Sequence, residues 1–248
     1  MVGFALSLVI LTLVSFPQGV IALVLRTRME ESQQFEQLQQ TGSIADVPAL
    51  EALTASPRGV FTVFGLSLTS LMSFYLTFTY LSTYFQRQGV MSGMAAAWST
   101  TGALSLGMLV IPFWGRVSDR VGRRPLLISV CVANLLLAYP AFEAMSHSVA
   151  AAVIVQIILG QFEAIYMGVM LATYCEQFPA RVRASGFNLG YNLASVLAGG
   201  TAPYLATWLI SATGDAKAPA WMLTIAALLS LVTALSLSET ARRPLSMA

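Results

Sequence analysis

Long apolar runs separated by short polar stretches alternate along the whole chain. Seven of them reach about 20 residues, the helical length that crosses a hydrocarbon core of about 30 Å. They cover residues 2–25, 59–85, 92–114, 125–145, 149–175, 186–210 and 218–237. Membrane strands need only about 10 residues of alternating pattern. The runs therefore predict an all-α polytopic membrane protein with about seven transmembrane helices.

The composition agrees with a bilayer as the main solvent. Hydrophobic residues make up 56% of the 248 residues and charged residues only 10%, against about 25% charged residues in a soluble domain. The net charge of +2 is too small and scattered for a nucleic-acid partner. Cys131 and Cys175 lie in or beside apolar runs without metal-ligand spacing, so we expect free thiols, no metal site and no cofactor.

Basic residues gather on one side of the predicted spans. The loops and tail on that side carry Arg26, Arg28, Arg58, Arg116, Arg120, Arg123, Arg124, Arg181, Arg183, Arg242 and Arg243. The opposite side carries only Arg87 and Lys217. Since basic loops stay in the cytoplasm, we expect the N-terminus outside and the C-terminus inside.

These runs divide the chain into four parts. We expect a transmembrane helix at 1–25, a cytoplasmic central loop at 26–58, a six-helix bundle at 59–238 and a cytoplasmic tail at 239–248. The loop is Gln-rich and broken by Gly42, Pro48 and Pro57, with a helical turn or two expected around 29–39. An odd number of spans and a methionine directly before the first suggest that a preceding segment is missing.

The most informative stretch, GRVSDRVGRRP at 115–125, connects the third and fourth runs. Its glycines, Gly115 and Gly122, allow close helix approach and unusual backbone angles. Asp119 can pair with the arginines around it, which are Arg116, Arg120, Arg123 and Arg124. On charge alone, these arginines are equally explained by their cytoplasmic side.

The order G-x-x-x-D-R-x-G-R-R resembles the cytoplasmic loop motif of the major facilitator superfamily. That motif follows the second helix of each six-helix half. The resemblance implies that the first run is helix six of a twelve-helix fold, and that the others are helices seven to twelve.

Further stretches resemble the metabolite:proton symporter family, which includes proline/betaine, α-ketoglutarate and shikimate permeases. They are LRTRMEESQQFE at 25–36, EQFPARVRASG at 176–186, GYN at 190–192, GGTAP at 199–203 and ATWLI at 206–210. Gln33 departs from the pattern, because a proline is common there. The similarity covers nearly the whole chain, but only the second half of the family's fold.

One acidic residue, Glu163, lies near the middle of the fifth run. A charge at bilayer depth costs about 2.5 to 3.5 kcal/mol, so this residue needs a partner, a wet cavity or a proton. We expect it to contact substrate, proton or a pairing group; a protonated carboxyl bonded to a neighbouring helix is the structural alternative. Gln156 lies two turns earlier on the same face.

Polar stripes mark two further runs. The second carries Thr69, Ser73, Thr77, Tyr80 and Tyr84, and the sixth carries Asn188, Asn192, Ser195 and Gly199. Such stripes line a pathway or form interhelical hydrogen bonds. The resemblance favours the pathway, because it implies that helices seven, eight, ten and eleven surround the central cavity. The only histidine, His147, falls in a short outer loop, where we expect it to be solvated.

These features predict half of a secondary transporter in a bacterial cytoplasmic membrane. It would carry a small polar metabolite by proton symport, with the bilayer and a missing N-terminal six-helix half as partners. The alternative is a non-transporting fragment, or an assembly or binding subunit. An enzyme is not expected, because no Ser/His/Asp set, metal cluster or phosphate loop is evident.

Overall fold

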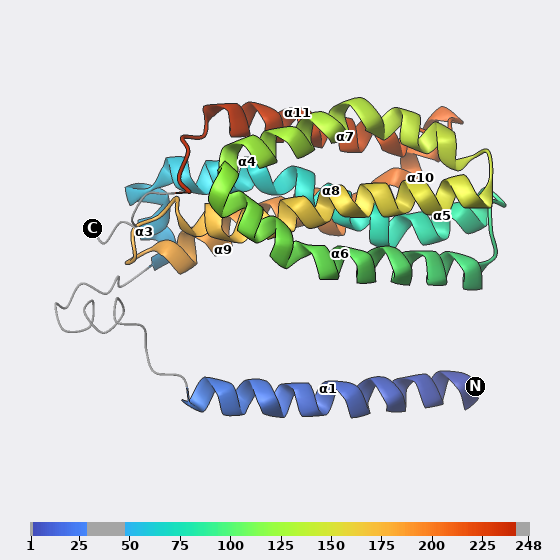
Figure 1. Cartoon of the computed structure of the whole chain (residues 1–248), viewed down its shortest axis with the longest axis horizontal. Coiled ribbons are helices and arrows are strands. Elements are labelled where there is room, and N and C mark those ends of the chain that lie inside the picture. The colour runs from blue at the N-terminus through green and yellow to red at the C-terminus, as the bar shows by residue number, and fades with distance from the viewer. Residues whose placement is uncertain (1, 29–47, 242–248) are drawn as a thin grey trace. The chain divides into compact units, whose positions relative to one another are not determined.

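The computed structural model describes residues 2–28 and 48–241 (Figure 1). They belong to two units, which are described separately. The first contains α1 (Val2–Arg28), a helix of 27 residues that coincides with the first apolar run. The helical turn expected around 29–39 lies outside the described residues.

Among its described residues, the second unit contains six helices or composite helices long and apolar enough to cross a membrane. Pro57–Arg87 combines α4 (Pro57–Phe74), η1 (Tyr75–Tyr80) and α5 (Leu81–Arg87), and Arg183–Thr213 combines α9 (Arg183–Ala194), η2 (Ser195–Gly200) and α10 (Ala202–Thr213). The other four are α6 (Gly93–Val121), α7 (Arg123–Met145), α8 (Val149–Cys175) and α11 (Pro219–Ser236). The all-α membrane fold is confirmed; a bilayer position for α1 stays a prediction.

Local sequence signals set the helix ends. Ser92 and Ser148 cap α6 and α8 by accepting hydrogen bonds from backbone N–H groups three residues later. Pro48 and Pro57 start α3 (Pro48–Ala55) and α4, although the sequence analysis treated them as breaks in a loop. A proline at the first helical position needs no N–H bond, so it suits a helix start.

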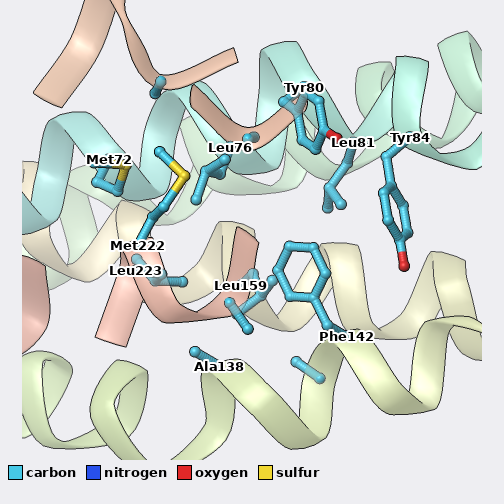
Figure 2. Close-up of a cluster of buried hydrophobic side chains, with 14 of the residues drawn as sticks. Met72, Leu76, Tyr80, Leu81, Tyr84, Ala138, Phe142, Leu159, Met222 and Leu223 are labelled. Atoms are coloured by element: carbon cyan, nitrogen blue, oxygen red, sulfur yellow. The ribbon is translucent and has the colours of Figure 1, made fainter. Parts of the chain in front are cut away.

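The helices of this unit alternate in direction, and α4 packs against α8, α9 and α11 (Figure 1). Two buried apolar clusters fill the bundle, one at each end. The first is built from α4, η1, α7, α8 and α11 around Leu76, Phe142 and Leu223 (Figure 2). The connection between α6 and α7, the end of α8 and the end of α11 lie at the other end, which we name the arginine-rich end.

Two spans contain a π-helical turn, η1 and η2, which the apolar pattern did not predict. A π-turn loosens the regular helical ladder and often occurs at functional sites. Here η1 lies beside α8, and Gly199 in η2 faces Tyr75 of η1. The two irregular turns, η1 and η2, therefore lie next to each other.

We expect Gly168→Ala to destabilise the bundle by about 2 kcal/mol. A Cβ at Gly168 would lie 2.9 Å from the Ile111 carbonyl oxygen and 3.1 Å from the Gly115 nitrogen, both backbone atoms of α6. Gly102→Ala is the control, because nothing lies within 4 Å of its added Cβ. Thermal unfolding in detergent checks this; equal melting temperatures for the two variants would contradict it.

Candidate functional site

The carboxyl group of Glu163 is buried between α8 and α4. Its residue is 1% exposed, and the Ser70 hydroxyl donates a 2.6 Å hydrogen bond to its Oε1. Its Oε2 is also buried but makes no hydrogen bond with the described residues. Ser70 is thus the pairing group that the sequence required but did not name.

No salt bridge reaches Glu163 within residues 48–241, the unit in which it lies. A charged carboxylate would have one hydrogen bond and no counter-ion, whereas a neutral carboxylic acid needs much less solvation. The group also lies inside the bundle and not on an open face. This geometry favours a proton or pairing role over direct contact with a substrate.

Gln156, two turns away on α8, is fully hydrogen-bonded. Its Nε2 donates to the Thr77 carbonyl oxygen and to Thr100 Oγ1, both at 3.0 Å. Its Oε1 accepts a short hydrogen bond from Ser99. Gln156 therefore joins α8 to α6 and to the π-turn η1.

The stripe on the second run faces the bundle interior. Thr77 is 1% exposed and its hydroxyl makes no hydrogen bond with the described residues. Tyr80 and Tyr84 lie in the apolar cluster of Figure 2. There the Tyr84 ring packs edge-on against the Phe142 ring, with 5.5 Å between the ring centroids. These two tyrosines are neighbours of apolar side chains in this structure.

The asparagines of the sixth run lie elsewhere. Asn188 and Asn192 are exposed on α9, and Asn192 Nδ2 donates a 2.7 Å hydrogen bond to the Asn188 carbonyl oxygen. The structure thus joins Gln156 to Thr77, but it does not join the asparagines to Glu163.

Two of the buried α4 residues on the Glu163 side, Ser67 and Ser70, were not predicted from the sequence, whereas Ser73 belonged to the predicted stripe. Ser67, Ser70 and Ser73 are buried on one face of α4, with Thr77 next in line. Their spacing of three or four residues marks a helix face. This repeat was the available signal; the predicted stripe shares Ser73 and Thr77 with it and departs from it at Thr69 and the tyrosines.

Arg123 organises the charged loop at the arginine-rich end. Its guanidinium donates to Ser118 Oγ and Asp119 Oδ1, both at 2.9 Å, and forms a salt bridge with Glu176 at 2.9 Å. The expected pairing of Asp119 with an arginine is confirmed. The sequence analysis missed Glu176, because nothing in its local pattern marks it as the partner.

The other motif residues have separate places. Gly122 ends α6 with φ of 115°, and Gly115 lies so near α8 that an added Cβ would be 3.4 Å from the Gly168 carbonyl oxygen. Both expectations for these glycines are confirmed. Arg124 donates to the Leu235 carbonyl oxygen at 2.7 Å, and Arg120 is exposed.

The segment after α11 caps the start of α7. Glu239 accepts hydrogen bonds from the backbone N–H groups of Arg123 at 2.9 Å and Arg124 at 3.1 Å. Thr240 donates to Glu176. The tail and the charged loop thus form one cluster with Arg123 at its centre, in which the carboxylate meets the positive end of a helix.

We expect the cluster to weaken in acid. Partial burial alone would raise the pKa of Glu239, but backbone N–H donors from Ala241, Arg123, Arg124 and Thr240 hold this pKa below its ordinary value. The stabilisation that ionised Glu239 provides is therefore fully present above a pH of about 4.3, the ordinary pKa of a glutamate side chain. It is lost as the pH falls through the lowered pKa of Glu239.

Melting temperatures at several acidic pH values check this prediction. Glu239→Gln replaces one acceptor oxygen with a donor that faces N–H groups, so it should lower the melting temperature at neutral pH and flatten the acid dependence. An unchanged acid dependence in this variant would contradict the assignment.

Comparison with known proteins adds independent information. Residues 63–246 match the model of the Major Facilitator Superfamily. The proline/betaine transporter of Salmonella typhimurium is 32% identical over 94% of this chain and 48% of its own length. The shikimate transporter of Escherichia coli is 31% identical over 89% of this chain and 52% of its own length. The alpha-ketoglutarate permease of the same organism is 29% identical over 88% of this chain and 50% of its own length. The chain spans about half the length of these relatives, and the resemblance seen in the sequence is confirmed.

Proposed function

The chain belongs to the major facilitator superfamily, and from this premise we propose that it supplies the C-terminal half of a proton symporter. The cargo is a small polar metabolite, either an organic acid or a zwitterion. The observation that carries the proposal is Glu163, a carboxyl group at membrane depth with one hydrogen bond and no counter-ion. Such a group is suited to binding and releasing one proton per cycle.

The cargo class follows from the relatives' names. The relatives are named as transporters or permeases of proline and betaine, of shikimate and of alpha-ketoglutarate. All these molecules are small and carry a carboxylate group. We therefore infer a carboxylate-bearing cargo for this chain, without choosing among them.

Transport proceeds by alternating access, in which two six-helix bundles rock around a midplane site. Glu163 takes the proton inside this bundle, and the exposed Asn188 and Asn192 face the cargo or the missing N-terminal half. The ion pairs around Arg123 break and re-form as the helices move.

The location is a bacterial cytoplasmic membrane, with the arginine-rich end inside. Single cysteines test this orientation in a background with Cys131 and Cys175 replaced by Ser. We expect an impermeant maleimide to label His147→Cys in intact spheroplasts, and Arg116→Cys only after permeabilisation. The opposite labelling pattern would reverse the orientation.

A second candidate is a non-transporting fragment or an assembly subunit. The half-length match to the relatives favours it, because a site between two bundles cannot be built from one. The DNA upstream of the first codon discriminates: about five further helices and a second copy of the loop motif support the transporter.

An uptake panel tests the proposal itself. Cells expressing the complete transporter, meaning this chain together with its N-terminal half, are given radiolabelled betaine, proline, 2-oxoglutarate, citrate and shikimate. We expect accumulation of at least one compound, which a protonophore abolishes, and no uptake by the chain alone. No accumulation of any compound would favour the fragment.

A further inference from the structure

An unusual set of polar groups lies between α4 and α8. Five buried atoms there make no hydrogen bond with the described residues. They are the hydroxyls of Ser67, Ser73, Thr77 and Tyr174 and the Oε2 of Glu163, in residues that are each at most 1% exposed. Buried polar groups are nearly always paired, and an unpaired one often marks a water or ion site. A cluster of five in one helix interface therefore needs a common explanation.

Three hydrogen bonds fix the order of these groups along the interface. Gln156 meets the Thr77 carbonyl oxygen, Glu163 meets Ser70, and Tyr166 donates to the Leu66 carbonyl oxygen at 2.6 Å. The pairs follow in antiparallel order, so the two helices share one continuous polar interface. We name it the α4–α8 seam.

The part of the seam beyond Glu163 leads to the arginine-rich end. Tyr174 interacts with both Ser67 and Glu163, and it precedes Cys175, the last residue of α8. Glu176 follows directly and belongs to the charged cluster of Arg123. On α4, Ser67 lies about one turn nearer the arginine-rich end than Ser70, and Tyr174 is part of the buried apolar cluster at that end.

The opposite part of the seam is held differently. Gln156 uses both its amide nitrogen and its oxygen in bonds to Thr77, Thr100 and Ser99. An amide bonded in this way does not pass protons along, because it neither gains nor loses one. In this conformation Gln156 holds one side of the seam, although the Thr77 hydroxyl there stays unpaired, and the other side ends at the unpaired hydroxyls of Ser67 and Tyr174.

We propose that Ser67 and Tyr174, with water between them, carry protons between Glu163 and the arginine-rich end. This inference rests on the proposed function, in which Glu163 is the proton carrier. In each transfer one proton leaves the Glu163 carboxyl, each hydroxyl or water accepts one proton and donates another, and one proton reaches bulk water. A water admitted to the seam would have the unpaired oxygens of Ser67, Tyr174 and Glu163 as partners.

Three other titratable groups lie near Glu163 or Tyr174 among the described residues. Tyr166 also lies on α8, but its hydroxyl is committed to the Leu66 carbonyl oxygen. Tyr191 approaches from α9, where it is partly buried, and Cys131 of α7 interacts with Tyr166 and Tyr174. Tyr174 itself is fully buried, and its hydroxyl makes no hydrogen bond with the described residues.

Infrared difference spectroscopy of the complete transporter after a pH jump tests the path without knowledge of the cargo. The carboxyl band that disappears in Glu163→Gln reports the protonation of Glu163. Tyr174→Phe and Ser67→Ala each remove one hydroxyl. We expect each to slow the change of this band after the pH jump on the order of tenfold, because water replaces a positioned hydroxyl only in part. Tyr166→Phe is the matched control: it removes the same group from an equally buried tyrosine of the same helix.

The possible results distinguish the proton path through Ser67 and Tyr174 from the role of Glu163 as the proton carrier. Slowing in Tyr174→Phe and Ser67→Ala, but not in Tyr166→Phe, supports the path. A normal rate in both test variants, with Glu163 still titrating, overturns the path and leaves the proposed function standing. A carboxyl band that never responds to pH removes Glu163 as the proton carrier and overturns both.

Discussion

Glu163→Gln should lower proton-driven uptake by the complete transporter on the order of 100-fold, the scale of a positioned proton-transfer group. Glutamine has nearly the same shape, and its amide oxygen still accepts the hydrogen bond from Ser70. What it loses is the exchangeable carboxyl proton. The bundle should therefore fold and insert as before, while substrate no longer accumulates against its gradient.

Two controls make this result specific. Glu143→Gln makes the same chemical change on α7, at a side chain that is 46% exposed and paired with Lys217, and it should alter uptake less than about twofold. Substrate-for-substrate exchange at equal pH needs no net proton release, so it should survive in Glu163→Gln. Normal accumulation by Glu163→Gln would exclude this residue from the coupling.

Arg123→Ala should destabilise the bundle by about 2 to 4 kcal/mol, somewhat below the range for breaking a fully buried ion pair. The Arg123 side chain is 10% exposed and that of Glu176 13%. Without the guanidinium, Glu176 keeps only the Thr240 hydroxyl as a bonding partner among the described residues. Thermal unfolding of purified protein in detergent measures the loss.

Arg116→Ala is the matched control, because Arg116 is an exposed arginine of the same motif. It should change the melting temperature little, since exposed charges contribute at most about 1 kcal/mol. The double variant Arg123→Ala with Glu176→Ala should be less destabilised than the sum of the two single variants. Equal effects of Arg123→Ala and Arg116→Ala would mean that only positive charge matters at this end.

The membrane fold was predictable because its signals are long and redundant. A run of about 20 apolar residues specifies a spanning helix without detailed packing. The motif at 115–125 also worked well, because Gly122 requires an unusual backbone angle and Asp119 has an arginine four residues away. These are local constraints that a single sequence carries in full.

The site was less predictable because it depends on how each helix is rotated. Ser73 and Thr77 belong both to the stripe predicted from the sequence and to the α4–α8 seam, so spacing alone did not separate the two faces. Tyr80 and Tyr84 are polar at one atom only, and their rings joined the apolar cluster, where they bury a large area. Ser70 and Glu239 meet partners 93 and 116 residues away, which no local pattern reveals.

Proton movement measured together with substrate movement tests the central claim most directly. Proteoliposomes that contain the complete transporter and an entrapped pH dye would receive the substrate identified by the uptake panel, with no imposed gradient. The account predicts internal acidification that accompanies substrate entry and disappears in Glu163→Gln. Substrate entry without any acidification in the unaltered protein would contradict it.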